Sequence, residues 1–202
     1  METVRRAPVT VLLIAIHIIV FLLLSFGGNP EDEYYMLEHG AMYTPGLVKE
    51  DYYRLFTSIF LHFGIEHLVN NMFVLGVIGT RLEPVLGSVK TLVLFVLSGL
   101  GGNVLTLLTD TSDFVITVSA GASGAVFGFS GALLCLTLMY RGSIGNITWK
   151  GMLLMVGLNL YTGFTSEGVN NVAHIGGLIT GFLLTLLIGR KLNANKGAGR
   201  CA

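Results

Sequence analysis

Six apolar segments constrain this chain more than any other feature of its sequence. They fall near residues 8–26, 63–82, 89–109, 123–140, 147–164 and 171–189. Most approach the roughly 20 residues that a helix needs to cross about 30 Å of hydrocarbon, although Lys150 interrupts the fifth. The chain is 52% hydrophobic and only 12% charged, which is too apolar for an ordinary soluble domain. The pattern therefore predicts an all-α membrane protein that crosses the bilayer six times.

The distribution of charge predicts the orientation of these spans. The formal net charge is zero, and we expect no nucleic-acid partner. In a six-pass arrangement, one side carries most of the basic residues, namely Arg5, Arg6, Arg81, Lys90, Arg141, Lys150, Arg190, Lys191, Lys196 and Arg200. The other side carries only two, Lys49 and Arg54. Because cytoplasmic loops are rich in Lys and Arg, we expect cytoplasmic tails at 1–7 and 190–202 and a membrane domain at 8–189.

The longest connection, residues 27–62, joins the first two spans on the outer side. It combines acidic residues with five tyrosines, namely Tyr34, Tyr35, Tyr43, Tyr52 and Tyr53. Tyrosine rings favour the boundary between water and hydrocarbon. We therefore expect a long, partly helical first external loop that lies at the outer surface, in contact with membrane lipids.

Three polar side chains are predicted to lie at a similar depth in the membrane. Counting back from the basic residues of the inner face, at about 1.5 Å per residue, places Ser123 roughly 27 Å, His174 roughly 24 Å and His67 roughly 21 Å above that face. Asn71 follows His67 by one helical turn, on the same face. Polar groups are costly inside a bilayer, so their convergence in its outer half predicts a functional site.

Small residues indicate which helices meet at that depth. Two stripes of them are present: Gly124, Gly128 and Ala132 on the fourth segment, and Ala173, Gly177 and Gly181 on the sixth. Such stripes let helix backbones approach closely. Ser123 and His174 each neighbour the top of a stripe, so hydroxyl and imidazole would come within hydrogen-bonding reach, as nucleophilic catalysis requires. Ser123 also opens its helix after Gly121 and Ala122, where free N–H groups can stabilise an oxyanion.

Other intramembrane chemistries do not fit these residues. Metalloproteases need an HExxH motif, which is absent, and His62 and His67 are predicted to point about 140° apart on a helix. An aspartyl mechanism needs two aspartates inside the membrane, whereas every aspartate of this chain falls in a predicted connection between spans. We expect no metal and no cofactor. His17 has no polar neighbour in its segment and is expected to be structural, and Glu66 has no assigned role.

Three separate motifs resemble the rhomboid family of intramembrane serine proteases. They are "GASG" with Ser123, "AHIGG" with His174, and "HFGIEHLVNN" at 62–71. The resemblance runs from Tyr52 to Gly181, with the motifs in the family's order. It is to the bacterial-type core and implies a bundle of six transmembrane helices in a prokaryotic cell membrane.

The resemblance also implies roles for single residues. Ser123 and His174 would form a catalytic dyad with no acidic third member, while His67 and Asn71 would line the oxyanion site together with the Ser123 amide. Two further positions would be structural, Arg54 in the first loop and Glu83 at the end of the second span. Two departures from the family pattern are modest. "YYR" stands where many members have a tryptophan before the arginine, and Phe127 stands where some carry a tyrosine packed on the catalytic histidine.

The function predicted from these residues is a serine endopeptidase that cleaves transmembrane protein substrates near the external face. The resemblance further implies a small residue before the scissile bond. A second hypothesis is a non-catalytic membrane chaperone or scaffold of the same fold, which binds transmembrane helices without cutting them. A transporter of small solutes is a more distant alternative. The presence of both Ser123 and His174 favours the protease, because a protein without catalysis does not need the pair.

Overall fold

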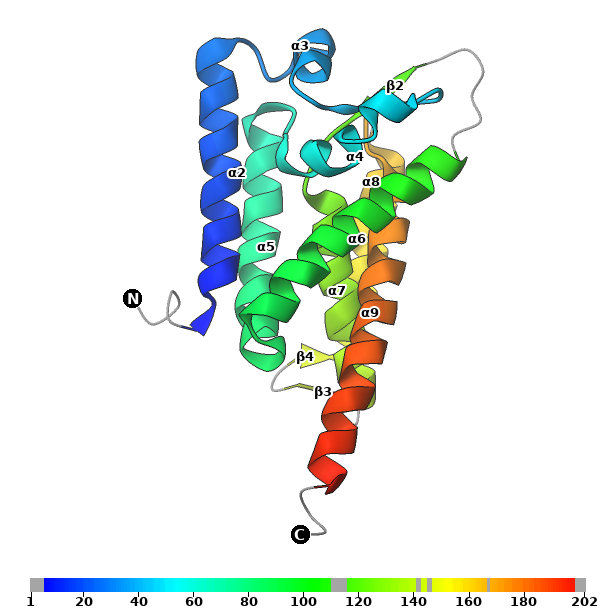
Figure 1. Ribbon diagram of the computed structural model, residues 1–202. Helices are drawn as coiled ribbons and strands as arrows, with labels where there is room; N and C mark the ends of the chain where they lie inside the picture. Colours follow the sequence, from blue (N-terminus) through cyan, green and yellow to red (C-terminus); the bar gives the residue numbers. More distant parts are fainter. Residues whose placement is uncertain (1–5, 110–115, 141–142, 145–146, 167, 199–202) are drawn as a thin grey trace.

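The computed structural model describes residues 6–109, 116–140, 143–144, 147–166 and 168–198. Within these residues, six long helices form a bundle (Figure 1). They are α2 (Pro8–Gly27), α5 (Gly64–Leu86), α6 (Ser88–Thr109), α7 (Ser123–Met139), α8 (Trp149–Thr165) and α9 (Asn171–Ala198). Each begins within a few residues of a predicted apolar segment, so the prediction of a mostly helical fold is confirmed.

The carboxylate of Glu83 joins the ends of three helices. The first N–H groups of a helix have no partner within it, and in α2 those of Val9 and Thr10 donate to Glu83 at 2.9 and 2.8 Å. The Thr10 hydroxyl donates to the same carboxylate at 2.8 Å, and the hydroxyl of Ser88, at the start of α6, does so at 2.7 Å. Glu83 is only 1% exposed, and its charge is therefore held by hydrogen bonds in place of water.

Short elements form the connection between α2 and α5 and lie together at one end of the bundle (Figure 1). In chain order they are α3 (Glu33–Glu38), β1 (Met42–Thr44), the 3₁₀ turn η1 (Lys49–Asp51), α4 (Arg54–Thr57) and the 3₁₀ turn η2 (Ser58–Phe60). Asp32 begins α3 by accepting a hydrogen bond from the Tyr35 N–H at 2.8 Å, as N-cap residues do. The connection therefore has its own ordered structure.

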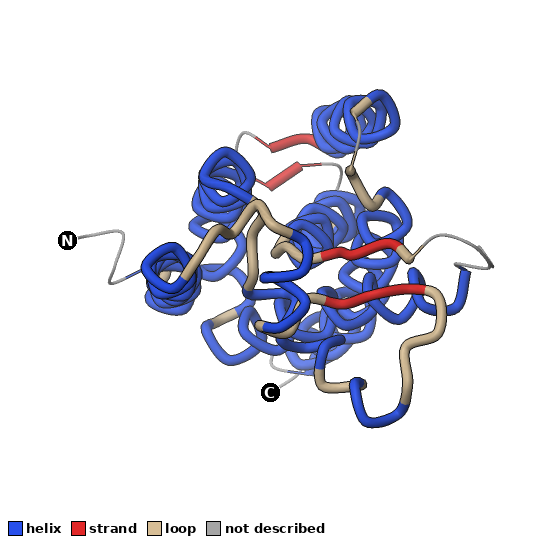
Figure 2. Tube along the Cα trace, turned by 90° about the horizontal axis from the view of Figure 1, so that it is seen from above, coloured by secondary structure: helices blue, strands red, loops and turns tan. Residues whose placement is uncertain are grey.

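Two short strand pairs depart from the all-α prediction (Figure 2). β1 pairs antiparallel with β2 (Thr117–Ser119), with Met42 opposite Ser119. β3 (Ser143–Ile144) pairs antiparallel with β4 (Ile147–Thr148). Strands of two or three residues are too short to show a period of two in the sequence. The first pair matters for the site, because it attaches the α2–α5 connection to the segment that leads into α7.

α7 forms the centre of the bundle. It contacts α5, α6, α8 and α9, and most of its side chains are buried. Phe129 of α7 meets Phe95 of α6 edge to face, with ring centroids 6.0 Å apart, and both rings are fully buried. By contrast, α2 lies at the edge of the bundle (Figure 2) and exposes apolar side chains such as Leu23 and Phe26. An exposed apolar face of this kind suits contact with lipid better than contact with water.

Among the described residues, three helices are long and apolar enough to cross a membrane: α2, α6 and the part of α9 from Asn171 to Ile188. α5 passes the same test together with the preceding Lys49–Phe60, from which it is bent by 73°. α7 is apolar but has only 17 residues. Length and composition therefore make three or four of the long helices candidate spans.

Candidate active site

Ser123 is the first residue of α7, and a sharp glycine bend precedes it. Gly121 has a φ of +144°, which residues with a Cβ rarely adopt. Its N–H donates to the Ser58 carbonyl oxygen at 2.9 Å, and this bond fixes the bend. The first N–H groups of α7 lack partners within the helix, and the N-terminus of a helix favours negative charge. Ser123 thus lies where an oxyanion can be stabilised.

The imidazole of His67, from α5, lies directly against Gly121. A Cβ added at Gly121 would lie 2.8 Å from Cε1 and 3.0 Å from Nε2 of His67, and 3.7 Å from Oγ of Ser123. The ring of His67 and the hydroxyl of Ser123 therefore face the same point. Glycine is required there twice, once for its φ and once for the space that His67 occupies.

The glycine stripes of α7 and α9 lie against each other. A Cβ added at Gly177 would overlap the carbonyl oxygen of Gly124, and one added at Gly181 would overlap that of Gly128. The Cβ position of Gly124 in turn lies 3.3 Å from the Ala173 carbonyl oxygen. Any larger side chain would push the two backbones apart. The packing of the fourth predicted segment on the sixth is thus backbone to backbone.

His174 is buried between these two helices. It is 8% exposed, and its ring stacks on Phe127 of α7 with centroids 4.3 Å apart and an interplanar angle of 11°. Phe127 follows Ser123 by four residues and so lies on the same face of α7. The structure therefore brings the imidazole to the face of α7 that carries Ser123.

Asn170 fixes the helix that carries His174, a role not assigned from the sequence. Its Oδ1 accepts a hydrogen bond from the Ala173 N–H at 2.9 Å, and its Nδ2 donates to Oγ1 of Thr106 on α6 at 3.1 Å. An asparagine directly before an apolar segment is an N-cap signal, so the sequence did contain the necessary information.

His62 lies beside His67, which corrects the expected angle between them. The prediction of about 140° assumed that one helix carries both residues. Instead α5 begins at Gly64, after His62, and the two ring centroids are 5.1 Å apart. His62 Nε2 accepts a hydrogen bond from the Ala122 N–H at 3.4 Å, one residue before Ser123. Asn71 donates to the His67 carbonyl oxygen at 3.0 Å within α5.

His17 has polar neighbours, whereas the sequence of its own segment had indicated none. It is fully buried, and its Nδ1 lies 2.7 Å from the Leu13 carbonyl oxygen. Its ring also meets that of His62 edge to face, with centroids 5.4 Å apart. His62 comes from a different part of the chain, so the sequence around His17 did not predict this neighbour, whereas Leu13 lies one turn earlier in the same helix.

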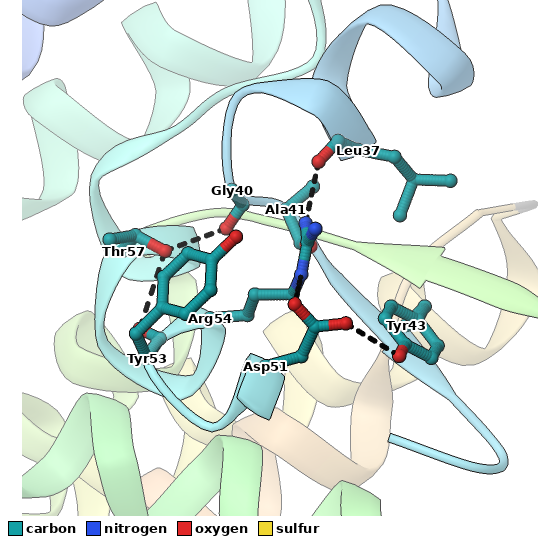
Figure 3. Close-up of polar contacts among 8 residues, drawn as sticks. All are labelled: Leu37, Gly40, Ala41, Tyr43, Asp51, Tyr53, Arg54 and Thr57. Atoms are coloured by element: carbon teal, nitrogen blue, oxygen red, sulfur yellow. Dashed lines mark hydrogen bonds and ion pairs between the residues drawn. The ribbon is translucent and has the colours of Figure 1, made fainter. Parts of the chain in front are cut away.

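Arg54 anchors the α2–α5 connection. Figure 3 shows its guanidinium beside the carbonyl groups of Leu37 and Ala41, to which it donates, and beside Asp51, with which it forms an ion pair at 3.0 Å. The hydroxyl of Tyr43 donates to the other carboxylate oxygen of Asp51 at 2.8 Å. This hydrogen bond, and then the Arg54 guanidinium, lower the pKa of Asp51. The Arg54 network lies in the connection that β1, by pairing with β2, attaches to the segment before α7.

Glu66 is exposed in the first turn of α5. With Ile65, Val69 and Asn70 it lines a shallow hollow of about 380 Å³ on the outer side of that helix. Within the part of the chain that the structure describes, no three His, Cys, Asp or Glu side chains are grouped closely enough to hold a metal ion.

The long apolar helices and the apolar outer faces of the bundle make the chain an integral membrane protein. Residues 49–191 match the family model described as the Rhomboid domain, which is more than half of the chain. The chain therefore belongs to the rhomboid family, and the resemblance drawn from its motifs is confirmed.

Similar proteins come from bacteria and plants. Rhomboid protease GluP of Bacillus subtilis (strain 168) is 34% identical over 182 residues, 89% of this chain and 34% of that protein. The rhomboid-type protein YdcA of the same strain is 30% identical over 188 residues, 93% of this chain and 92% of YdcA. RHOMBOID-like protein 5 of Arabidopsis thaliana is 40% identical over 147 residues, 70% of this chain and 46% of that protein. The chain thus spans about a third of GluP and nearly all of YdcA.

Proposed function

We propose that this protein is an intramembrane serine endopeptidase that cleaves transmembrane segments of other membrane proteins near the external face. Ser123 is the nucleophile and His174 its general base. The observation that carries the proposal is that side chains from three helices, α5, α7 and α9, lie together near the start of α7. Ser123 begins α7, His67 of α5 lies against the bend before it, and His174 of α9 stacks on the same face of α7.

The proposed reaction passes through an acyl-enzyme on Ser123. As Oγ of Ser123 attacks the carbonyl carbon of the scissile bond, its proton passes to the imidazole of His174. The imidazolium then gives that proton to the leaving amine, and the C–N bond breaks to leave an acyl-enzyme. Water attacks the ester, His174 takes the proton from the water, and Oγ of Ser123 regains a proton as the new carboxylic acid leaves.

The negative charge of the tetrahedral intermediate falls on the former carbonyl oxygen. We assign its stabilisation to the Ser123 amide at the start of α7 and to the side chains of His67 and Asn71. The contact of His67 with Gly121 supports this assignment for the imidazole. Asn71 is one turn further along α5, where its Nδ2 donates one N–H to the His67 carbonyl oxygen, and we assign the second N–H of that amide to the oxyanion. Preorganised donors of this kind commonly supply the largest electrostatic contribution to catalysis.

The membrane arrangement is part of the proposal. All six long helices cross the bilayer as the membrane domain at 8–189, with both tails, 1–7 and 190–202, in the cytoplasm of a prokaryotic cell. The α2–α5 connection then lies at the outer surface, in contact with lipid. The sorting of basic residues to one side supports this orientation. The small size of α7, with its 17 residues, suits a helix that begins below the outer surface.

Purified protein in liposomes, incubated with a second protein that has one transmembrane helix, tests the proposal. We expect two fragments whose masses place the cut near the outer end of that helix, and none with Ser123→Ala. Binding of the helix by the wild type without any cleavage would instead indicate the chaperone or scaffold function.

A further inference from the structure

A side chain of α6 holds the turn Arg54–Phe60, which consists of α4 and η2. The Nδ2 of Asn103 donates to the Leu55 carbonyl oxygen at 2.7 Å and to the Ser58 hydroxyl at 2.9 Å. These partners precede Asn103 by 48 and 45 positions, so the contact is one of tertiary structure. Ser58 is only 1% exposed, which leaves its hydroxyl no water to replace Asn103. Both bonds are therefore costly to remove.

The face of α6 toward this turn is shaped to receive it. Gly99 precedes Asn103 by one helical turn, and a Cβ added at Gly99 would lie 2.7 Å from Cδ1 of Ile59 in η2. Gly99 thus lets η2 approach the backbone of α6, and Asn103 supplies the donors that fix it. These contacts fix the position of the turn Arg54–Phe60 along α6 and its distance from that helix.

The same turn holds the loop before Ser123. The Gly121 N–H donates to the Ser58 carbonyl oxygen at 2.9 Å, two residues before the proposed nucleophile. A path of hydrogen bonds therefore runs from Asn103 to Ser58, and from Ser58 to Gly121. Gly121 in turn lies against His67, so a shift of the bend changes the distance between His67 and Ser123.

We infer that Asn103 is a positioning residue, which sets the place of Ser123 through Ser58 and Gly121. The expected effect of Asn103 on the rate of cleavage rests on the proposed hydrolase function. Its expected effect on the position of the Gly121 bend rests on the hydrogen bonds alone. When Asn103 is replaced by a residue without the two N–H donors, the Leu55 carbonyl and the Ser58 hydroxyl lose their partner. The turn Arg54–Phe60 and the Gly121 bend then move together. A misplacement of about 1 Å in a reacting group costs on the order of a hundredfold in rate.

The catalytic consequence is tested with Asn103→Leu and the isosteric Asn103→Asp, neither of which has the two N–H donors. Thr109→Val is the matched control, because Thr109 is exposed on the same helix and donates only within it, at 2.8 Å to the Leu105 carbonyl oxygen. We expect kcat for a reconstituted transmembrane substrate to fall by about tenfold to a hundredfold in both Asn103 variants, with KM and the control unchanged. A wild-type kcat, or a change in KM alone, would overturn the inference.

The mechanical part is tested by amide hydrogen exchange at Gly121, in a Ser123→Ala background that needs no activity. We expect Asn103→Leu to speed this exchange by about tenfold or more, since local opening exposes the amide, and Thr109→Val to leave it unchanged. Unchanged exchange in Asn103→Leu would contradict the positioning role whether or not the wild type cleaves. Faster exchange in a protein whose wild type cleaves nothing would support the hydrogen-bond path and count against the proposed function.

Discussion

Gly121 brings together the residues that the proposed chemistry needs. Its φ of +144° turns the chain into α7, and its missing side chain leaves room for His67. Its N–H is bound to Ser58 and its neighbour Ala122 to His62, so the bend is held from two sides. Ser123 therefore emerges from a fixed backbone, which is what a nucleophile requires to meet a carbonyl at a defined angle.

At the residue scale, the proposed dyad of Ser123 and His174 predicts non-additive losses. We expect Ser123→Ala and His174→Ala each to abolish cleavage, and the double variant to be about as slow as either, because the two side chains act in one step. Initial rates of substrate cleavage measure this. A double variant far slower than both single variants would show that the residues act independently.

The oxyanion assignment predicts a different kinetic pattern for His67. We expect His67→Ala to lower kcat by about a hundredfold to a thousandfold, with little change in KM, since the lost donor acts mainly in the transition state. Steady-state kinetics in detergent micelles, with thermal unfolding measured in parallel, separates this from a packing role. Loss of thermal stability in proportion to the loss of rate would make His67 structural.

At the scale of elements, the contact of α7 with α9 sets the distance between Ser123 and His174. Because the backbones touch at Gly124 and Gly177, one methyl group is enough to separate them. We expect Gly177→Ala to lower the free energy of unfolding by about 1–3 kcal/mol through overpacking. Gly157→Ala on α8 is the matched control, because its Cβ would meet nothing within 4 Å. Equal thermal midpoints for the two variants would contradict backbone contact.

The Arg54 network predicts sensitivity of the α2–α5 connection to acid. The lowered pKa of Asp51 means that its carboxylate stabilises the native state above the ordinary aspartate pKa of about 4. That contribution is lost as the pH falls through the lower value of the folded state. We expect the thermal midpoint of the wild type to fall more steeply than that of Asp51→Asn between about pH 5 and pH 3. Parallel curves would show that Asp51 contributes nothing.

Apolar length and charge could predict the helices, because each long segment is bounded by polar connections. The glycine stripes predicted that the fourth segment packs on the sixth, since such stripes let two helix backbones approach closely. The turn Arg54–Phe60 could not be predicted, because its partners, Asn103 and Gly121, are far away in the sequence. His62 was misplaced because a helix was assumed to run through it, whereas α5 begins only at Gly64.

For the whole molecule, the proposed depth of Ser123 decides which substrates are cut. A peptide bond within a transmembrane helix is hidden by its own hydrogen bonds, so the substrate must unwind near the outer surface. We expect replacement of a Gly or Pro near the outer end of a cleaved helix by Leu to slow cutting, because Leu stabilises the helix. Replacing the small residue before the scissile bond by Phe should slow cutting more severely. Fragment yields over time measure both, and equal cutting of unbroken Leu-rich helices near their cytoplasmic end would contradict this account.

The most direct measurement is covalent labelling of the membrane-embedded wild type with a fluorophosphonate probe, followed by mass spectrometry of the modified peptide. We expect one label, on Ser123, because the proposed mechanism gives this serine a general base, and loss of the label in both Ser123→Ala and His174→Ala. A label on another serine, or undiminished labelling of Ser123 in His174→Ala, would contradict the central claim that these two side chains form one catalytic unit.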